Sequence, residues 1–504
     1  MDDVLKLDSL PTTHAIETLV QDENDALQMF DQISYFKASS VIRMLATQIG
    51  QDTFLRGLTS YLRKHAYQNA RSQDLWDALS EVSGINVSEL MDSWIHTCGF
   101  PVLQVPDPIV RDALKQSSIF STEIHETTGS WHLPRVGAPE EKDQLLSWYN
   151  NPSQSSKTGS FVLNRAHVGY CCVDHDQNAA ELIVQSLPVL SSSDLAGVIV
   201  DKNILAINNL KPTSELLDLI WNLKDTTDCF AWLSISRTLS YLSSVFSTDA
   251  TIMVGLNSYI DALISSAKHR VKWTAEPMTY TQSELNKSII SLAFSAGMKN
   301  SESLIQEARR YFERWATGVN EVLPPSLRGV VLSGCISIGT ENDFELVKQM
   351  FQSDKSLDGQ EIILNALGCV NDTVLAEQIL DFAFSGDSVA LQHLHLLGGA
   401  LGQNNVCRIT QWEYAKRNWS KVSQRLEANA VCRDWWIEES LRHFSDLTLE
   451  EDVNTFLREN AGSVINKPLE YVKANIRRNA TYKERAREDI YCWLVSHCFM
   501  PIKQ

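Results

Sequence analysis

The chain has 504 residues, and its 44 Lys and Arg against 62 Asp and Glu give a formal net charge of −18. Hydrophobic residues make up 44%, too many for a disordered chain and enough for the cores of roughly two to four domains. The acidic balance argues against a non-specific nucleic-acid-binding protein, because nothing offsets repulsion from phosphate. No apolar run reaches the ~18 residues of a membrane-spanning helix, and the first residues lack the order of a signal peptide. We therefore expect a cytoplasmic multidomain protein without a membrane span.

Cysteine usage agrees with a reducing compartment. The chain has ten cysteines and no Cys-x-x-Cys pair, and a disulfide framework would be denser in a shorter chain. We expect all ten to be buried free thiols.

The first hundred residues predict a compact block of helices. Apolar residues recur at helical spacing around residues 33–49 and again around residues 54–62. Another helix begins near Ser72, which is a plausible N-cap. The next opens at Asn86, with Glu89 at the spacing of a capping box. Gly99 and Pro101 end this block.

The next segment, to about residue 178, changes character. Short runs rich in alternating or β-branched residues are separated by turn-forming segments, and about six strands over ~75 residues indicate a small β-sandwich. The predicted strands cover residues 102–105, 118–125, 145–149, 160–163 and 168–173.

Residues 179–504 are helical almost throughout, with helices of ~10–15 residues and short polar turns. No strict sequence period is present, but this pattern predicts stacked antiparallel helix pairs with a curved, concave surface. The predicted fold is therefore mainly α with a small β-sandwich.

A search for catalytic and metal-binding motifs finds none. His125-Glu126 is the nearest approach to His-Glu-x-x-His, but a glycine replaces the second histidine in a strand-and-turn segment. His393 and His395 would point to different faces of a helix. His167 and His175 are expected at strand edges or turns, and Gly398-Gly399 at a helix end. No Gly-x-Ser-x-Gly elbow, Walker loop or Gly-x-Gly-x-x-Gly occurs, so we assign no metal ligands.

One stretch, residues 30–45 (FDQISYFKASSVIRML), closely resembles a motif of the zinc aminopeptidases of the alanyl/puromycin-sensitive (gluzincin) family. Residues 13–16, 66–70, 74–79, 90–94 and 99–102 match that family in order and spacing. Weaker similarity continues through residues 131–134, 163–164, 169–170, 194–201 and 324–328, and at Trp412 with residues 418–419. The resemblance spans essentially the whole chain.

The resemblance implies a domain plan. Family members have an N-terminal β domain, a thermolysin-like zinc domain, a small β-sandwich and a large helical bowl. Residues 1–100 would be the rear, helical part of the zinc domain, residues 101–178 the sandwich, and residues 179–504 a HEAT/armadillo-like superhelical domain. The family's Gly-Ala-Met-Glu-Asn loop, its His-Glu-x-x-His helix and its third zinc ligand precede the matched part. They occur nowhere in this sequence. The family uses one zinc ion, and we expect none bound to this chain.

One catalytic residue follows from the resemblance. Tyr35 lies where the family has a tyrosine that donates a hydrogen bond to the oxyanion of the tetrahedral intermediate. The alternative is a buried tyrosine at the start of a helix. Phe36, Ala38 and the Cys171-Cys172 pair depart from the family's usual residues, which are small polar, glycine and Tyr-Arg. No substrate-binding residues are assigned, because the substrate loop is missing.

Two functional hypotheses remain open. In the first, the chain is the truncated C-terminal portion of an enzyme that removes N-terminal residues from peptides. It would be inactive alone, and it could be a fragment of a longer gene product, a degenerate copy, or a subunit completed by a separately encoded front half. In the second, it is a non-catalytic peptide-binding or scaffold protein that uses the helical bowl. A face of residues 1–100 that lacks its packing partner would also favour self-association.

Overall fold

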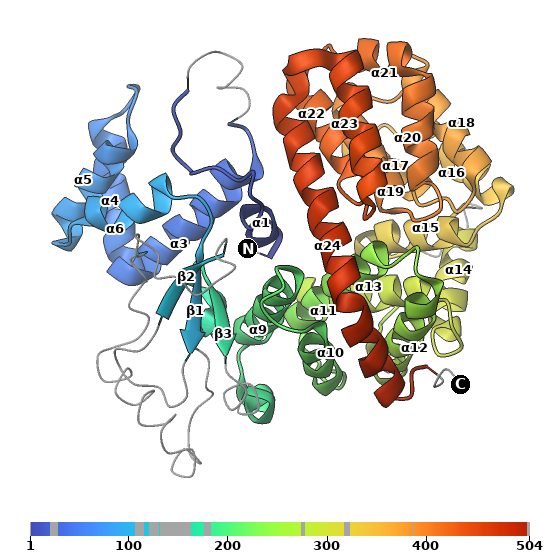
Figure 1. Cartoon of the computed structure of the whole chain (residues 1–504), viewed down its shortest axis with the longest axis horizontal. Coiled ribbons are helices and arrows are strands. Elements are labelled where there is room, and N and C mark those ends of the chain that lie inside the picture. The colour runs from blue at the N-terminus through green and yellow to red at the C-terminus, as the bar shows by residue number, and fades with distance from the viewer. Residues whose placement is uncertain are drawn as a thin grey trace. The chain divides into compact units, whose positions relative to one another are not determined.

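The computed structural model describes residues 2–20, 29–105, 115–119, 131, 163–175, 183–273, 278–316, 323–386 and 388–500. Contacts divide the chain into two compact units, Met1–Asn208 and Asn209–Gln504. The described residues are mainly helical with one small sheet (Figure 1), which confirms the predicted fold class at that level. The boundaries predicted at residues 100 and 178 stay predictions. No helix within these described ranges has the length and apolar composition needed to cross a bilayer.

The first unit opens with the helical block that the apolar spacing predicted. Its elements are α1 (Asp2–Asp8), a π-helical turn η1 (Ile33–Lys37), α3 (Ala38–Ile49), α4 (Gln51–Lys64), α5 (Ser72–Ser83) and α6 (Val87–His96). The Asn86 side chain accepts the Glu89 N–H at 3.3 Å, which confirms that cap. At α5 the prediction was wrong by one residue. Ser72 is already helical, and the Asp74 carboxylate accepts the N–H of the N-cap residue Arg71 at 2.8 Å.

A three-stranded sheet follows, in the order β2-β1-β3. The central strand β1 (Pro101–Val105) pairs antiparallel with β2 (Lys115–Ser118) and parallel with β3 (Cys172–His175). Helix α9 (Ser192–Ile207) packs against β3 and against the 3-10 turn η3 (Arg165–His167). The strand predicted at residues 145–149 and most of those predicted at 118–125 and 160–163 lie outside the described residues. The described part of the predicted sandwich is this one sheet.

The second unit is a stack of helices in two layers. Helices α11, α13, α15, α17, α19 and α22 pack in series, each against the next one named. Of the helices between them, α12, α14, α16 and α20 pack beside this series, and α18 packs against α20. The bounds are α10 (Thr213–Asn222), α11 (Cys229–Val245), α12 (Ala250–Ala267), α13 (Tyr280–Ala296), α14 (Glu302–Ala316), α15 (Arg328–Ser337), α16 (Glu341–Ser353), α17 (Leu357–Leu367), α18 (Thr373–Phe384), α19 (Leu394–Gln403), α20 (Arg408–Arg417), α21 (Trp419–Leu426), α22 (Ala430–Leu441), α23 (Leu447–Ala461) and α24 (Asn466–Ser496).

Short polar side chains begin many of these helices, because each N-cap oxygen accepts a backbone N–H that has no partner within the helix. The capping residues are Asp228, Asp249, Thr279, Thr340, Ser356, Asp372, Asn429 and Asp446. The local sequence therefore sets where the helices start, and the apolar core between them holds the layers together.

The last helix, α24, connects the two ends of this stack. It has 31 residues, so at 1.5 Å per residue it is about 46 Å long. It packs against α22 and α23 and also against α10, α11 and α12 (Figure 1). One helix thus contacts both the earliest and the latest elements of the second unit.

An aromatic cluster holds the C-terminal end of α24. The Trp493 ring meets Tyr259 of α12 edge-on at 5.1 Å, and its Nε1–H donates to Asp218 of α10 at 2.7 Å. Phe499 folds back onto the same group and lies 5.2 Å from Tyr259 and 5.4 Å from Trp221. These contacts join α24 to α10 and α12.

Glycines bring α19 and α22 into close contact. The prediction that Gly398-Gly399 ends a helix is wrong, because both residues lie inside α19. A Cβ atom at Gly402 would lie 2.7 Å from the backbone oxygens of both Glu439 and Ser440. A Cβ at Gly399 would meet only the Glu439 side chain, at 3.3 Å or more. The backbones of the two helices therefore approach closely at Gly402.

We predict opposite effects for alanine at these two glycines. Gly402→Ala should lower the free energy of unfolding of the second unit by about 1–3 kcal/mol, because backbone atoms of α22 must move. Gly399→Ala should raise it by up to about 1 kcal/mol, because alanine is the better helix former and the Glu439 side chain can yield. Hydrogen exchange of peptides from α19 and α22 measures both. Equal effects of the two variants would contradict the close approach.

The ten cysteines all lie within the described residues and are free, as predicted. The prediction that all are buried is wrong. Cys98, Cys492 and Cys498 are exposed, and Cys369 and Cys432 are partly exposed. These thiols lie on outer helix faces and at helix ends, where composition alone does not reveal exposure.

Candidate functional site

Tyr35 lies in the π-helical turn η1, which leads directly into α3. Ile33 and Lys37 are buried, whereas Tyr35 and Phe36 are 57% and 54% exposed. Residues four apart lie on nearly the same side of a helical turn, and the residue midway between them lies opposite. Because Ile33 and Lys37 point inward, Tyr35 is presented outward. The alternative of a buried tyrosine is therefore wrong.

Asp31 holds the N-terminal side of this turn. Its Oδ1 accepts the Ser34 N–H at 2.9 Å, and its main-chain oxygen accepts the Tyr35 N–H at 3.2 Å. Its Oδ2 lies 2.5 Å from Nε2 of His14, whose Nδ1 faces the Ala15 carbonyl oxygen at 2.8 Å. Both ring nitrogens thus lie within hydrogen-bonding distance of an oxygen atom. The segments 13–16 and 30–45, matched separately in sequence, thus meet here.

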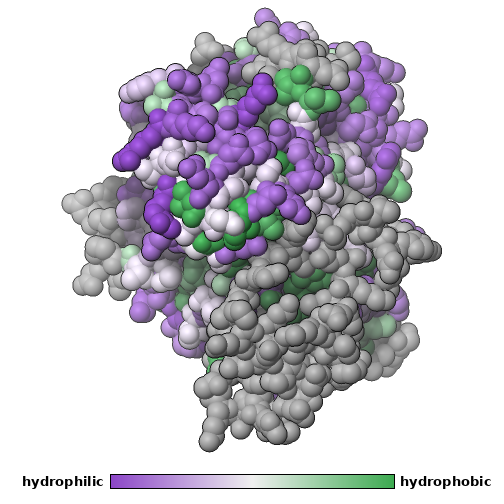
Figure 2. Space-filling view, turned by 90° about the vertical axis from the view of Figure 1, so that its left-hand side faces the viewer, coloured by the Kyte–Doolittle hydropathy of each residue, from purple (hydrophilic) through white to green (hydrophobic). Residues whose placement is uncertain are grey.

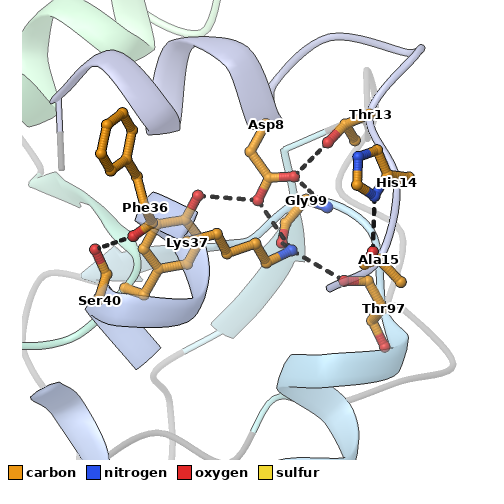
Figure 3. A network of polar contacts seen from close by, with 10 residues as sticks. Asp8, Thr13, His14, Ala15, Phe36, Lys37, Ser40, Thr97 and Gly99 are labelled. Carbon is orange, nitrogen blue, oxygen red and sulfur yellow. Dashed lines mark hydrogen bonds and ion pairs between the residues drawn. The ribbon is translucent and has the colours of Figure 1, made fainter. Parts of the chain in front are cut away.

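Lys37 holds the other side through a fully buried ion pair with Asp8, the last residue of α1 (Figure 3). Lys37 Nζ lies 3.0 Å from Asp8 Oδ2. It also donates to the carbonyl oxygens of Thr97, at 3.0 Å, and Gly99, at 2.9 Å. An ammonium group has three donors, so each finds an acceptor and the buried charge is satisfied.

The Asp8 carboxylate is equally well satisfied. Its Oδ1 accepts the Thr13 hydroxyl at 2.6 Å and the Gly99 N–H at 3.1 Å (Figure 3). Its Oδ2 accepts the Tyr170 hydroxyl at 3.0 Å in addition to the Lys37 ammonium. Burial, and then the Asp8 charge, hold the pKa of Tyr170 well above its ordinary value, so the phenol stays a donor. We call Asp8, Lys37, Thr13, Thr97, Gly99 and Tyr170 the Lys37 network.

Sequence reasoning missed Asp8 and Lys37 as functional residues. Lys37 lies within the stretch that resembles the family motif, but only its neighbours were singled out. A signal was present, because Ile33, Lys37 and Val41 follow each other at a spacing of four. A lysine at a position of the buried helix face requires an anionic or carbonyl partner.

Of the described histidines considered as metal ligands, two lie beside a carboxylate and one against a tryptophan ring. His167, in η3, pairs with Asp201 of α9 at 3.2 Å, and His175 ends β3, as expected for turn and strand-edge residues. His393 lies 3.4 Å from Glu361, whereas His395 packs edge-on against Trp435. His125 lies outside the described residues. Within those residues no three His, Cys, Asp or Glu side chains are grouped to hold a metal ion. They therefore do not fit a zinc site.

The Cys171-Cys172 pair, which departs from the family's residues, is buried beside α9. Burial, and then the Asp201 carboxylate, raise the pKa of both thiols. The Cys172 thiol donates to the Asp201 main-chain oxygen at 3.5 Å. Protonated, buried thiols of this kind are unreactive packing residues.

In the second unit, the half-buried carboxyl group of Glu438 in α22 has a raised pKa. Burial, and after it the charges of Asp434 and Glu439, raise the pKa of Glu438 from 4.5 to about 8. Lys467 and Arg442 act in the opposite direction. Arg442 is engaged with Glu439 at 2.7 Å.

We predict that Glu438 makes the second unit less stable as the pH rises. Because its pKa is higher in the folded state, the folded state binds more protons between about pH 4.5 and 8, so stability falls across that window. Glu438→Gln should therefore stabilise the unit by about 1–3 kcal/mol at pH 9 and by little at pH 5. Thermal unfolding at both pH values measures this. The exposed Glu459→Gln serves as control, and an equal gain at both pH values would contradict the prediction.

The comparisons with known proteins cover both units. The Peptidase family M1 domain profile matches residues 1–94, and the ERAP1-like C-terminal domain profile matches residues 160–478. The chain is 26% identical over 502 residues to the alanine/arginine aminopeptidase of Saccharomyces cerevisiae, which covers 98% of this chain and 58% of that protein. It is 26% identical over 517 residues to the glutamyl aminopeptidase of Bos taurus (98% and 53%). It is 25% identical over 533 residues to the thyrotropin-releasing hormone-degrading ectoenzyme of Rattus norvegicus (98% and 49%). The chain thus spans about half the length of these relatives.

Proposed function

Because this chain belongs to the M1 aminopeptidase family, as the end of the peptidase domain followed by an ERAP1-like C-terminal domain, we propose that it is the rear part of an enzyme that removes N-terminal residues from peptides. The observation that carries this proposal is the outward, exposed position of Tyr35 on the turn η1. A buried phenol could not reach a substrate.

In this proposal Tyr35 acts through its hydroxyl group. Its O–H donates a hydrogen bond to the peptide carbonyl oxygen while that oxygen becomes negative in the transition state. Such a donor lowers the barrier because it binds the developing charge more strongly than the ground state, and its removal costs about 10²–10³ in rate. Contacts of Asp31 and Lys37 hold the two sides of the turn that carries this tyrosine.

We further propose that the chain alone is inactive, since its sequence lacks His-Glu-x-x-His and its described residues offer no group of metal ligands. The zinc ion and substrate loop would come from a front half of the kind that the relatives have, since the chain spans about half of their length. Exposed apolar side chains on α4 support such a partner. Gly57 is the only buried residue of α4, while Leu55 and Leu62 are 49% and 58% exposed. Figure 2 looks onto the side of the first unit that carries α4 and α5, where hydrophobic groups lie among polar ones.

The test is reconstitution. The full chain is mixed with the zinc-binding front half of a relative, and hydrolysis of an alanine anilide is measured. We expect no turnover from the chain alone and turnover from the mixture. Tyr35→Phe should reduce turnover by about 10²–10³ without changing complex formation, whereas the exposed Tyr280→Phe should not reduce it.

Three results would contradict parts of this proposal. One equivalent of zinc with turnover in the chain alone would overturn the inactivity. Unchanged turnover of Tyr35→Phe would remove Tyr35 from the mechanism. If the exposed face of α4 has no partner, we expect self-association, and a monomer by light scattering at high concentration would contradict that expectation.

The second candidate function is peptide binding without catalysis. It is favoured by α24, which packs against both ends of the helical stack. The second unit is therefore held together by contacts among its own helices. We propose for this unit a HEAT/armadillo-like superhelix, and for residues 101–178 a small sandwich built on the observed sheet. A cytoplasmic location is supported by the free thiols. Fluorescence titration with peptide libraries tests binding, and no detectable binding would leave this candidate without support.

A further inference from the structure

We propose that the buried Lys37–Asp8 ion pair positions Tyr35, by locking the π-helical turn onto the ends of α1 and α6. The inference rests on the proposed role of Tyr35, since a position matters only if that hydroxyl acts. Lys37 itself is a positioning residue, because its buried ammonium group cannot reach a substrate.

The contacts of Lys37 show how the ion pair fixes the position of the turn η1. Lys37 is the last residue of the turn, two positions after Tyr35. Its Nζ reaches Asp8 at the end of α1 and the carbonyl oxygens of Thr97 and Gly99, just after α6. Three contacts of 2.9–3.0 Å from two chain segments define one position for the ammonium group. The turn cannot rotate or slide without breaking at least one of them.

Asp8 itself accepts hydrogen bonds from other segments, so the position of the carboxylate does not depend on Lys37 alone. Thr13, Gly99 and Tyr170 donate to its two oxygens. Gly99 participates twice, since its N–H binds Asp8 and its carbonyl oxygen binds Lys37. The Lys37 network thus connects the turn η1 to the segment after α6 through both partners of the ion pair.

The physical cost of the pair supports a positional role. Burying two charges is expensive, and replacing a buried ion pair by apolar residues is often neutral or stabilising. A cluster of apolar side chains would therefore hold α1 and the turn η1 together at least as well. What apolar packing lacks is direction, because hydrogen bonds to a charged group constrain distance and angle together. A π-helical turn is rare and occurs mostly as a single turn, and such directional contacts can hold it in one register.

The decisive experiment separates positioning from folding and needs neither zinc nor a partner. The full chain carries 3-fluorotyrosine at position 35, and its ¹⁹F signal is compared with hydrogen exchange of residues 33–37 and of α5 and α6. The variant is Asp8→Asn/Lys37→Met, which removes both charges and leaves no buried ion unpaired. The matched control is Lys64→Met, which alters an exposed lysine of α4.

In the double variant we expect exchange of residues 33–37 to rise at least tenfold while α5 and α6 keep their protection. The ¹⁹F signal should narrow and move toward that of free fluorotyrosine. Lys64→Met should change neither. An unchanged signal and unchanged exchange in the folded double variant would overturn the inference. Loss of protection throughout α5 and α6 would also overturn it, because the pair would then be a general element of the fold. If Tyr35→Phe leaves turnover unchanged in the reconstituted enzyme, the proposed function fails while this structural result stands.

Discussion

Replacing Lys37 alone by methionine is expected to lower the free energy of unfolding of the first unit by about 3–5 kcal/mol, because the Asp8 charge remains buried without its counter-ion. Asp8 is inaccessible to solvent, so water cannot take the place of the ammonium group. The carbonyl oxygens of Thr97 and Gly99 would also lose their donor. Adding Asp8→Asn should recover most of the loss, since the double variant buries no net charge.

Hydrogen exchange of α5 and α6 measures this effect in the first unit alone, which matters because a chain of two units does not unfold in one step. Lys64→Met is the control and should change protection by less than about 0.5 kcal/mol. Equal losses in the single and double variants would show that the charge of Asp8 is not the cause.

The second large effect is expected at the C-terminal end of α24. Trp493→Ala should lower the free energy of unfolding of the second unit by about 3–5 kcal/mol, because it removes a large buried ring and leaves a cavity. The ring contacts with Tyr259 and Phe499 and the hydrogen bond to Asp218 would be lost together. Trp493→Phe keeps a ring but not the donor, so we expect a loss of about 1–2 kcal/mol.

Urea unfolding followed by hydrogen exchange of α10 and α12 measures the loss at the helices that Trp493 contacts. Trp435→Ala is the matched control, because this tryptophan is 40% exposed and should cost less than half as much. If both alanine variants lower the free energy of unfolding equally, the aromatic cluster around Trp493 adds no more stability than the exposed Trp435 does.

Local patterns in the sequence predicted much of the fold. Helical spacing of apolar residues and the cap at Asn86 predicted the first helices, and the helical character of the second unit followed in the same way. The sheet was predicted less well. Strand β3 pairs in parallel with β1, about seventy residues earlier, and such pairing has no local signature. The contact of Gly402 with α22 is hidden for the same reason, since the partner helix lies far along the chain.

The candidate site was predictable in identity and not in geometry. Resemblance pointed to Tyr35, but a π-helical turn has no sequence signature, and its extra residue decides which side chains face outward. Lys37 would be placed at the surface by hydropathy alone. Only the meeting of α1, the turn and the segment after α6 supplies the acceptors that allow it to be buried.

The packing of α24 has a consequence for how this protein is made. Tyr259 of α12 can contact Trp493 and Phe499 only after about 240 further residues have been synthesised, which takes roughly 12–48 s at the usual rate of translation. During that time the surface of α10 and α12 that α24 will cover has no partner. The second unit therefore cannot reach its final packing before its last helix leaves the ribosome, and its early helices depend on chaperones or on provisional contacts until then.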